Sequence, residues 1–307
     1  MLKKGIVYCS TGSNYRIKSE GQFYDCRIKG KFRIKDIKST NPVAVGDKVS
    51  FTIEPKKKFK GVITAIETRQ NYIVRKSVNL SKQTHIIAAN IDQVFLMITL
   101  KTPQTFPAFI DRFLVTALAY DINMLLLFNK IDLYDKDELR VMRDLKSVYQ
   151  NIGYECHEVV ASDLKTLAFI QSKMEGKVSM FSGHSGAGKS TLVNSLSPGL
   201  DLKTASISKQ HQQGQHTTTF AEMFDLGASR IIDTPGIKGF GVVDIQPEEL
   251  SDYFIEFAAL KGSCKFNNCM HTSEPKCAIK EAIEVGKIAP SRYKSYLQLL
   301  EEDSLYR

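Results

Sequence analysis

The sequence predicts a mixed α/β fold in three parts: a small OB-like β-barrel, a mostly parallel doubly wound sheet, and a helical C-terminal part. Three observations predict it. Short alternating strands crowd the first 76 residues, strands and helices then alternate, and a helical, cysteine-bearing stretch follows Pro247. We expect domain boundaries that give parts 1–76, 77–245 and 246–307.

Length and composition set the class of protein. A chain of 307 residues is long enough for two or three domains. No apolar run approaches the roughly 18 residues that span a bilayer, and the first residues lack the apolar stretch of a secretory signal. We therefore expect a cytoplasmic protein with no membrane partner. Six cysteines fit that expectation if they are reduced or bound to metal.

The net charge of +9 is unevenly distributed. Residues 1–76 hold 18 Lys and Arg against 6 Asp and Glu, whereas the remainder holds 24 against 27. A basic block of this kind attracts a polyanion and strengthens its binding through counterion release. A basic face that is merely solvated remains an alternative on charge alone.

The N-terminal part alternates apolar and polar residues in short runs. Strands are expected at residues 5–10, 15–19, 22–28, 49–53 and 61–67. Turn-forming residues separate these runs. Five strands in so short a segment suit a closed barrel of the OB type, which frequently binds nucleic acid. A small SH3-like barrel would give nearly the same pattern.

The middle part alternates strands with helix-length segments. Strands are expected at 93–100, 123–128, 155–160, 177–181, 220–226 and 229–233, and helices at 109–120, 136–151, 164–174 and 189–196. This alternation predicts a mostly parallel sheet with helices on both faces. Such sheets bind ligands at the carboxyl ends of their strands, so the loops after the strands are the candidate site.

A glycine-rich segment follows the strand at 177–181. It reads Gly183, His184, Ser185, Gly186, Ala187, Gly188, Lys189, Ser190 and Thr191, which matches GxxxxGK[ST] between a strand and a helix. The glycines let backbone N–H groups point at phosphate oxygens. We expect Lys189 to reach the β- and γ-phosphates and the Ser190 hydroxyl to bind Mg²⁺.

Two further strand ends complete a nucleotide site. Asn129, Lys130, Ile131 and Asp132 form N-K-x-D after the strand at 123–128. The Asp132 carboxylate can accept both the N1–H and the exocyclic amine of guanine, donors that adenine does not offer in those places. Asn129 can bond the acceptor edge of the base, and the stem of Lys130 can lie over its face. The pattern therefore favours GTP over ATP.

The second of these strand ends carries Asp233-Thr-Pro-Gly236. Asp233 can hold Mg²⁺ through water, and the N–H of Gly236 can sense the γ-phosphate. A second base-contacting loop would normally carry Ser-Ala; the equivalent here is the segment 159–162, around Ala161 and Ser162, although it departs from that pattern.

The polar stretch 204–219 is the expected switch segment. Thr218 is the preferred residue to complete the Mg²⁺ shell, with Thr217 and Thr219 as alternatives. Many small GTPases place a glutamine just after the D-x-x-G glycine to orient the attacking water, but here Ile237 occupies that position. Another polar group is needed, and His216 is the best candidate.

Three of the six cysteines and a histidine lie within 14 residues. Cys264, Cys269, His271 and Cys277 have the donor set of a closed tetrahedral Zn²⁺ site, the structural type without an open position. The spacing is not one of the commonest finger patterns, so chance clustering remains open on spacing alone. Cys9, Cys26 and Cys156 are scattered and are expected to be ordinary thiols.

The order of these motifs is unusual, because the base reader precedes the phosphate loop. In this order the motifs resemble the RsgA/YjeQ family of circularly permuted GTPases, which assist maturation of the small ribosomal subunit. The segments that carry the resemblance are AANID at 88–92, NKID at 129–132, GHSGAGKST at 183–191, GQHTTT at 214–219, DTPG at 233–236 and the cysteine cluster. They span essentially the whole chain.

The resemblance implies a permuted P-loop GTPase sheet with an N-terminal OB-like barrel and a C-terminal helical zinc domain. It implies a monomeric GTP hydrolase that holds one structural Zn²⁺ and uses Mg²⁺ with GTP. It also points to His216 as the residue that positions the attacking water. The expected partners are the small ribosomal subunit, chiefly its rRNA, bound in the GTP state and left after hydrolysis to GDP.

Two alternatives of other classes stay open at this point. One is a metabolic P-loop kinase or ATPase, against which Asn129 and Asp132 argue. The other is an RNA-binding module without turnover, against which the intact Lys189, Ser190 and Asp233 argue. The hydrolysis rate and the precise rRNA contacts do not follow from the sequence.

Overall fold

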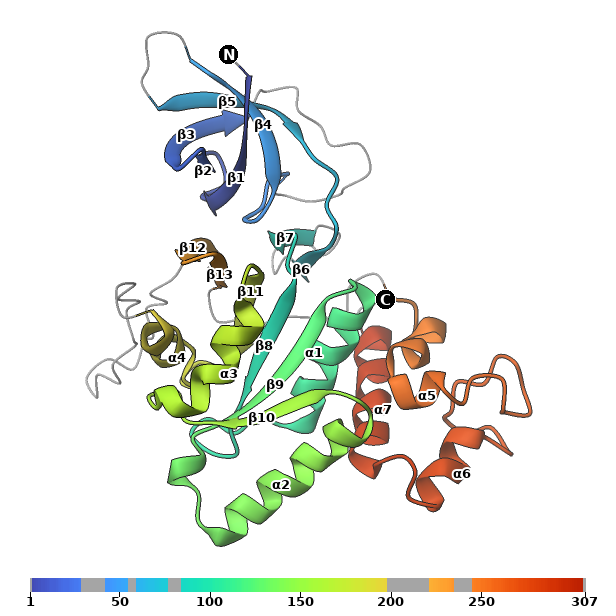
Figure 1. The fold of residues 1–307 in the computed structure, drawn as a ribbon. Helices are drawn as coiled ribbons and strands as arrows, with labels where there is room; N and C mark the ends of the chain where they lie inside the picture. Colours follow the sequence, from blue (N-terminus) through green and yellow to red (C-terminus); the bar gives the residue numbers. More distant parts are fainter. Residues whose placement is uncertain are drawn as a thin grey trace.

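The computed structural model describes residues 2–28, 42–54, 59–76, 84–197, 221–234 and 245–305. Figure 1 shows a barrel at one end, a sheet flanked by helices in the middle, and a helical part packed on one side of that sheet. Among the described residues, none of the helices combines the length and the apolar character that a membrane span needs.

The N-terminal part is a closed five-stranded barrel. Its strands are β1 (Leu2–Ser10), β2 (Tyr15–Ser19), β3 (Gln22–Ile28), β4 (Lys48–Ile53) and β5 (Lys60–Ile66). They pair in the order β1-β2-β3-β5-β4, and β4 closes the circuit on β1. The β3–β5 pair is parallel and the other pairs are antiparallel. This circuit is that of an OB barrel and decides against the SH3-like alternative.

The barrel joins a larger sheet through one strand pair. The strands of that sheet are β8 (Gln93–Ile98), β9 (Asn123–Asn129), β10 (Glu155–Val159), β11 (Val178–Gly183), β12 (Glu222–Leu226) and β13 (Ser229–Asp233). The order is β10-β9-β8-β11-β13-β12, in which the first five strands are parallel. β12 is the antiparallel partner of β13 and also pairs with β1, where Cys9 lies opposite Glu222.

Helices cover both faces of this sheet, as the doubly wound pattern predicts (Figure 1). They are α1 (Pro107–Ala119), α2 (Lys136–Asn151), α3 (Leu164–Met174) and α4 (Lys189–Leu196). Successive side chains of a strand point to opposite faces, so β8 contributes to two apolar cores. Val94, Leu96 and Ile98 pack in the core with α1 and α2, and Phe95 and Met97 pack in the core with α3 and α4.

A hairpin between the barrel and the sheet was not expected from the sequence. It consists of β6 (Tyr72–Lys76) and β7 (Thr84–Ala89). The linker before it is fixed to the barrel by a buried ion pair, in which Arg69 Nε lies 2.7 Å from Asp47 Oδ1. Asn90 then donates to the carbonyl of Gly46 at 2.9 Å. The barrel is therefore attached to the rest of the chain by several independent polar contacts.

The C-terminal part is helical, as expected after Pro247. It contains η2 (Pro247–Tyr253), α5 (Ile255–Ala258), α6 (Ala278–Glu284) and α7 (Pro290–Leu305). The long helix α7 lies along α1 of the central part (Figure 1). Val115 of α1 belongs to the same apolar core as these helices.

A buried network of charges holds α7 against the central part. Arg292 donates to Asp111 Oδ1 at 2.6 Å and to Glu256 Oε1 at 2.6 Å, and Tyr149 donates to the same Asp111 oxygen at 2.9 Å. The side chains of Arg292 and Asp111 are 1% and 0% exposed. Removing one member of such a buried pair leaves the partner's charge without compensation.

We predict that Arg292→Met lowers the free energy of unfolding of the C-terminal helices by about 3–5 kcal/mol, because Asp111 and Glu256 would stay buried without their cation. Urea unfolding combined with hydrogen exchange of α7 measures this change. Lys261→Ala is the matched control, because the Lys261–Asp252 pair is exposed (67% and 36%) and its loss costs about 1 kcal/mol or less. Equal effects of the two substitutions would contradict the prediction.

Candidate functional site

The predicted phosphate loop connects β11 to α4. Its three glycines have φ angles of +139° at Gly183, +83° at Gly186 and +105° at Gly188, values that side-chain-bearing residues rarely adopt. A Cβ atom on Gly188 would lie 2.4 Å from Asn129 Nδ2, and one on Gly183 would lie 2.7 Å from the carbonyl oxygen of Met97. Both backbone shape and close packing therefore require glycine in this loop.

Lys189 begins α4 and points back over the loop. Its ammonium donates to the carbonyl oxygens of Gly183 and His184, each at 2.7 Å. Burial lowers its pKa to about 8, against the opposing effect of the Asp233 carboxylate. Burial likewise raises the pKa of Asp233, although Lys189 opposes that shift. The structure therefore brings Lys189 and Asp233 within electrostatic reach of each other.

The remaining predicted residues of the loop lie around Lys189. Ser185, Gly186 and Thr191 are exposed, Ala187 is buried, and Ser190 is half-buried in the first turn of α4. An N-terminal helix turn favours negative charge because its N–H groups lack partners within the helix. Ser190 and Asp233 also offer hydroxyl and carboxylate oxygens, the donor types that Mg²⁺ prefers.

The base-reading segment meets the phosphate loop through Asn129. This residue ends β9 and is 1% exposed. Its amide nitrogen donates to the carbonyl of Ala187 at 2.7 Å, and its amide oxygen accepts the N–H of Ala161 at 3.0 Å. Asn129 thus connects three loops at the carboxyl edge of the sheet. Its second amide hydrogen takes no part in these two hydrogen bonds and can donate to the acceptor edge of a base.

The hydrogen bond to Ala161 concerns the segment 159–162, which the sequence analysis gives as the second base-contacting loop. Ala161 follows β10 and is 6% exposed, and it lies beside Asn129 through the hydrogen bond just described. The segment around Ala161 therefore borders Asn129, a predicted base contact. Its role as the second base-contacting loop stays a prediction.

Lys130 and Asp132 lie just beyond Asn129. Lys130 has φ +67°, and its ammonium donates to the carbonyl of Thr102 at 2.5 Å. Burial lowers the pKa of Lys130, and Asp132 opposes that shift. Ile131 and Asp132 open a short 3₁₀ turn (Ile131–Leu133), in which Asp132 is exposed. The carboxylate is therefore accessible to a ligand, as a base reader requires.

Two residues that support the site were missed by the sequence analysis. The hydroxyl of Tyr134 accepts the N–H of Leu100 at 2.8 Å and donates to the carbonyl of Asn129 at 2.9 Å. Phe109 of α1 stacks on His184 of the phosphate loop, with ring centroids 3.9 Å apart. Neither residue belongs to a motif, and no local signal marks contacts between segments 34 or 75 positions apart.

Several predicted residues cannot be placed. His216, Thr218 and Gly236 lie outside the described residues, as do Thr217, Thr219 and Ile237. The roles expected for them in hydrolysis and in sensing the γ-phosphate therefore stay predictions.

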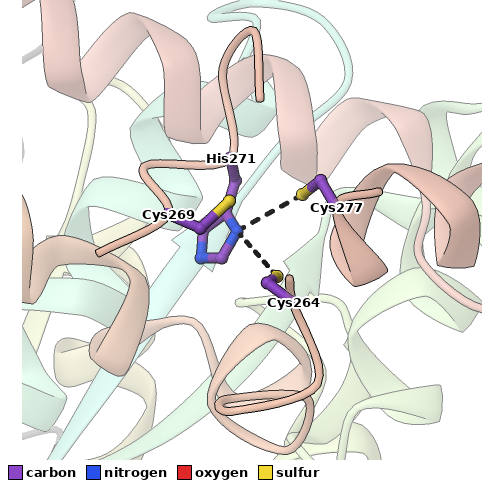
Figure 2. A group of neighbouring side chains, drawn as sticks. All are labelled: Cys264, Cys269, His271 and Cys277. Atoms are coloured by element: carbon purple, nitrogen blue, oxygen red, sulfur yellow. Dashed lines mark hydrogen bonds between the residues drawn. The ribbon is translucent and has the colours of Figure 1, made fainter. Parts of the chain in front are cut away.

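The four predicted metal ligands converge in the C-terminal part (Figure 2). The candidate ligand atoms of Cys264, Cys269, His271 and Cys277 all lie within 4.8 Å of one another. His271 Nδ1 lies 3.6 Å from Cys264 Sγ and 3.4 Å from Cys277 Sγ. A tetrahedral zinc with Zn–S about 2.3 Å and Zn–N about 2.0–2.1 Å requires an S···N separation of about 3.5–3.6 Å. The donor set and spacing therefore fit zinc.

The cluster is supported from α7. Tyr293 donates to the carbonyl of His271 at 2.7 Å, and Tyr296 donates to the carbonyl of Met270 at 2.9 Å. The carboxylate of Glu274 accepts the N–H groups of Met270 and Thr272, each at 2.8 Å. These contacts set the backbone around His271 so that Nδ1 faces the thiols.

Known proteins resemble this chain along almost its full length. A sequence model described as RsgA GTPase matches residues 66–243, and one described as RsgA N-terminal domain matches residues 4–63. A small ribosomal subunit biogenesis GTPase RsgA of Christiangramia forsetii is 63% identical over 99% of this chain and 98% of its own length. One from Bacteroides thetaiotaomicron, RsgA 2, is 50% identical, with 99% of both chains covered.

Solved structures agree with this result. YjeQ of Thermotoga maritima is 35% identical and superimposes with a TM-score of 0.77 over 98% of both chains. YloQ, described as a circularly permuted GTPase, is 29% identical with a TM-score of 0.74 over 100% of this chain and 96% of its own. The expected fold class and GTP hydrolase activity are thereby confirmed: the chain belongs to the RsgA family of circularly permuted GTPases.

Proposed function

We propose that this GTPase binds the small ribosomal subunit in its GTP state, assists late subunit maturation, and is released when GTP is hydrolysed. The observation that carries the nucleotide assignment is the amide of Asn129, which connects the phosphate loop at Ala187 with the segment at Ala161. The names of the relatives, small ribosomal subunit biogenesis GTPases, support the partner.

Lys189 is proposed to act on the phosphates. In hydrolysis a water oxygen attacks the γ-phosphorus, the bond from that phosphorus to the bridging oxygen breaks, and GDP and phosphate leave. The Lys189 ammonium, which rests on two loop carbonyls, is positioned to exchange them for phosphate oxygens. Phosphate charge offsets the burial that lowers its pKa to about 8 and keeps the amine protonated. Ser190 and, through water, Asp233 would hold Mg²⁺, which would supply further positive charge at the phosphates.

Base selection is assigned to Asp132 and its neighbours. The exposed Asp132 carboxylate accepts two hydrogen bonds from guanine, whereas adenine would leave it facing a ring nitrogen without a hydrogen. Lys130 is hydrogen-bonded to Thr102, and Asn129 is hydrogen-bonded to two loops. Both side chains are therefore already ordered beside the expected place of the base. Such prior ordering reduces the entropy lost on binding.

Hydrolysis is assigned to the switch segment. His216 is proposed to orient the attacking water, Thr218 to complete the Mg²⁺ shell, and the N–H of Gly236 to contact the γ-phosphate. We expect slow hydrolysis by the protein alone and faster hydrolysis when the subunit orders this segment.

The basic barrel is the proposed contact with rRNA, because an OB barrel with excess Lys and Arg suits a polyanion. We also propose that the chain works as a monomer in the cytoplasm, where a ribosome biogenesis factor acts. The division into parts 1–76, 77–245 and 246–307 stays part of this proposal.

Nucleotide turnover with and without purified small subunits tests the function. We expect GTP hydrolysis that rises at least about tenfold with subunits, and ATP hydrolysis near the background in both cases. Lys189→Met is the control and should abolish turnover of GTP. Preference for ATP would overturn the base assignment, and GTP turnover indifferent to subunits would overturn the partner.

His216→Ala should abolish the stimulated turnover while GTP affinity stays within about twofold of wild type, because the residue is assigned to the water and not to nucleotide binding. Fluorescent GTP-analogue binding and single-turnover hydrolysis on subunits measure the two quantities. Wild-type rates in this variant would end the assignment.

Zinc content tests the cysteine cluster. The purified chain should hold one zinc, and Cys277→Ser should lose it. The same substitution should expose α7 to hydrogen exchange, because Tyr293 and Tyr296 of α7 bind the carbonyls of His271 and Met270 in the cysteine cluster. Metal analysis and exchange mass spectrometry give these readouts. Cys9→Ser, on β1 of the barrel, should keep the metal. A zinc-free wild-type chain with a protected α7 would contradict the prediction.

A further inference from the structure

The seam between the barrel and the central sheet contains a carboxylate in a basic setting. β12 (Glu222–Leu226) pairs with β1 of the barrel on one side and with β13 on the other. Asp225 lies on β12 and accepts the hydroxyl of Tyr8 at 2.5 Å on one oxygen and the ammonium of Lys18 on the other. Arg230 Nε lies 3.8 Å from the first oxygen. Three donors of the kind that bind phosphate therefore surround one carboxylate.

The electrostatics show that this carboxylate is ionised. Burial alone would raise the pKa of Asp225, but the hydrogen bonds from Lys18 and Tyr8 outweigh it and leave the pKa below its usual value. The side chains of Asp225 and Lys18 are 37% and 28% exposed, so water and solutes reach the pair. An exposed pair of this kind is weak and can exchange partners.

A cavity of about 470 Å³ adjoins the pair, a size within the range of sites that hold one small ligand or one unit of a polymer. Its walls come from the barrel and from the β12–β13 hairpin. The charged side chains among them are Lys4, Lys18, Lys48 and Arg230 on the basic side, and Glu20, Glu67 and Asp225 on the acidic side. Glu20 is paired with Lys3, which is outside the lining, and Glu67 is paired with Lys4, so the lining itself carries four cations against three carboxylates.

The barrel face beside this cavity is the one that OB folds use for nucleic acid. Lys18 on β2 lies opposite Phe23 on β3, and the guanidinium of Arg16 lies 4.4 Å above the ring of Phe23. Strands 2 and 3 of OB barrels commonly bind oligonucleotides, with aromatic rings for bases and cations for phosphates. Asp225 thus occupies part of a face that is otherwise suited to single-stranded nucleic acid.

We infer that the seam cavity binds a backbone phosphate of single-stranded RNA, and that Asp225 occupies the place of this phosphate when RNA is absent. RNA and Asp225 then compete for Lys18, so the barrel binds RNA less tightly than its charge alone would allow. This inference rests on the proposed function for the choice of RNA as the polyanion. The inference adds where the RNA phosphate binds and names Asp225 as the group that competes with it for Lys18.

The competition can be measured with a fluorescent single-stranded RNA of about 12 nucleotides, a length within the site sizes of OB folds. Asp225→Asn should tighten binding by about fivefold, since Lys18 no longer has a competing partner. Lys18→Gln should weaken binding and reduce the salt slope of the affinity by about one between roughly 50 and 200 mM salt. In the double variant the gain from Asp225→Asn should disappear, because the two residues act through one contact.

Glu158→Gln is the matched control for lost negative charge. Glu158 is paired with Lys146 at 2.7 Å and lies on β10, the strand at the far edge of the sheet from the barrel. A gain from Asp225→Asn no larger than that from Glu158→Gln would overturn the inference. The inference would also be overturned if Asp225→Asn tightened RNA binding as much in the Lys18→Gln variant as in the wild-type chain. Subunit-stimulated GTP turnover of the wild-type chain is a separate measurement, so failure of the proposed function is told apart from failure of this site.

Discussion

The candidate nucleotide site is held together by one buried side-chain amide. Asn129 donates to the carbonyl of Ala187 and accepts the N–H of Ala161. The segments that follow β10 and β11 are therefore fixed to the end of β9 without a ligand. Gly188 must lack a side chain because Asn129 Nδ2 occupies that space. A buried polar group of this kind is stable only when its partners are present, and here the backbone of two loops supplies them.

Much of this arrangement could be predicted because its signals are local. The alternation in residues 15–19 and 22–28 matches β2 and β3. The glycine-rich loop and the cysteine cluster each lie within one short stretch of the sequence. The hairpin of β6 and β7 was missed because neither strand alternates apolar and polar residues: β6 reads YIVRK and β7 reads THIIAA. Tyr134 was missed because its hydroxyl bridges backbone groups of separate strands, which no spacing along the chain reveals.

The reversed order of motifs leaves the spatial order of a nucleotide-binding sheet intact. β11, which precedes the phosphate loop, lies between β8 and β13, so the carboxyl ends of β9, β11 and β13 lie at the same edge. The permutation changes what the sheet is connected to. Its first strand, β8, now follows the barrel and the β6–β7 hairpin, and its last strand, β13, precedes the helical C-terminal part. Both appended parts are therefore joined directly to the GTPase core.

Helix α1 contacts both the phosphate loop and the C-terminal part. Phe109 stacks on His184, and two positions later Asp111 binds Arg292 of α7. His184 in turn accepts a hydrogen bond from Lys189 through its carbonyl. Helix α1 therefore connects the phosphate loop to α7 through direct side-chain contacts. If a partner bound to α7 changes the affinity for the nucleotide, thermodynamic linkage requires the nucleotide to change the affinity for that partner by the same free energy.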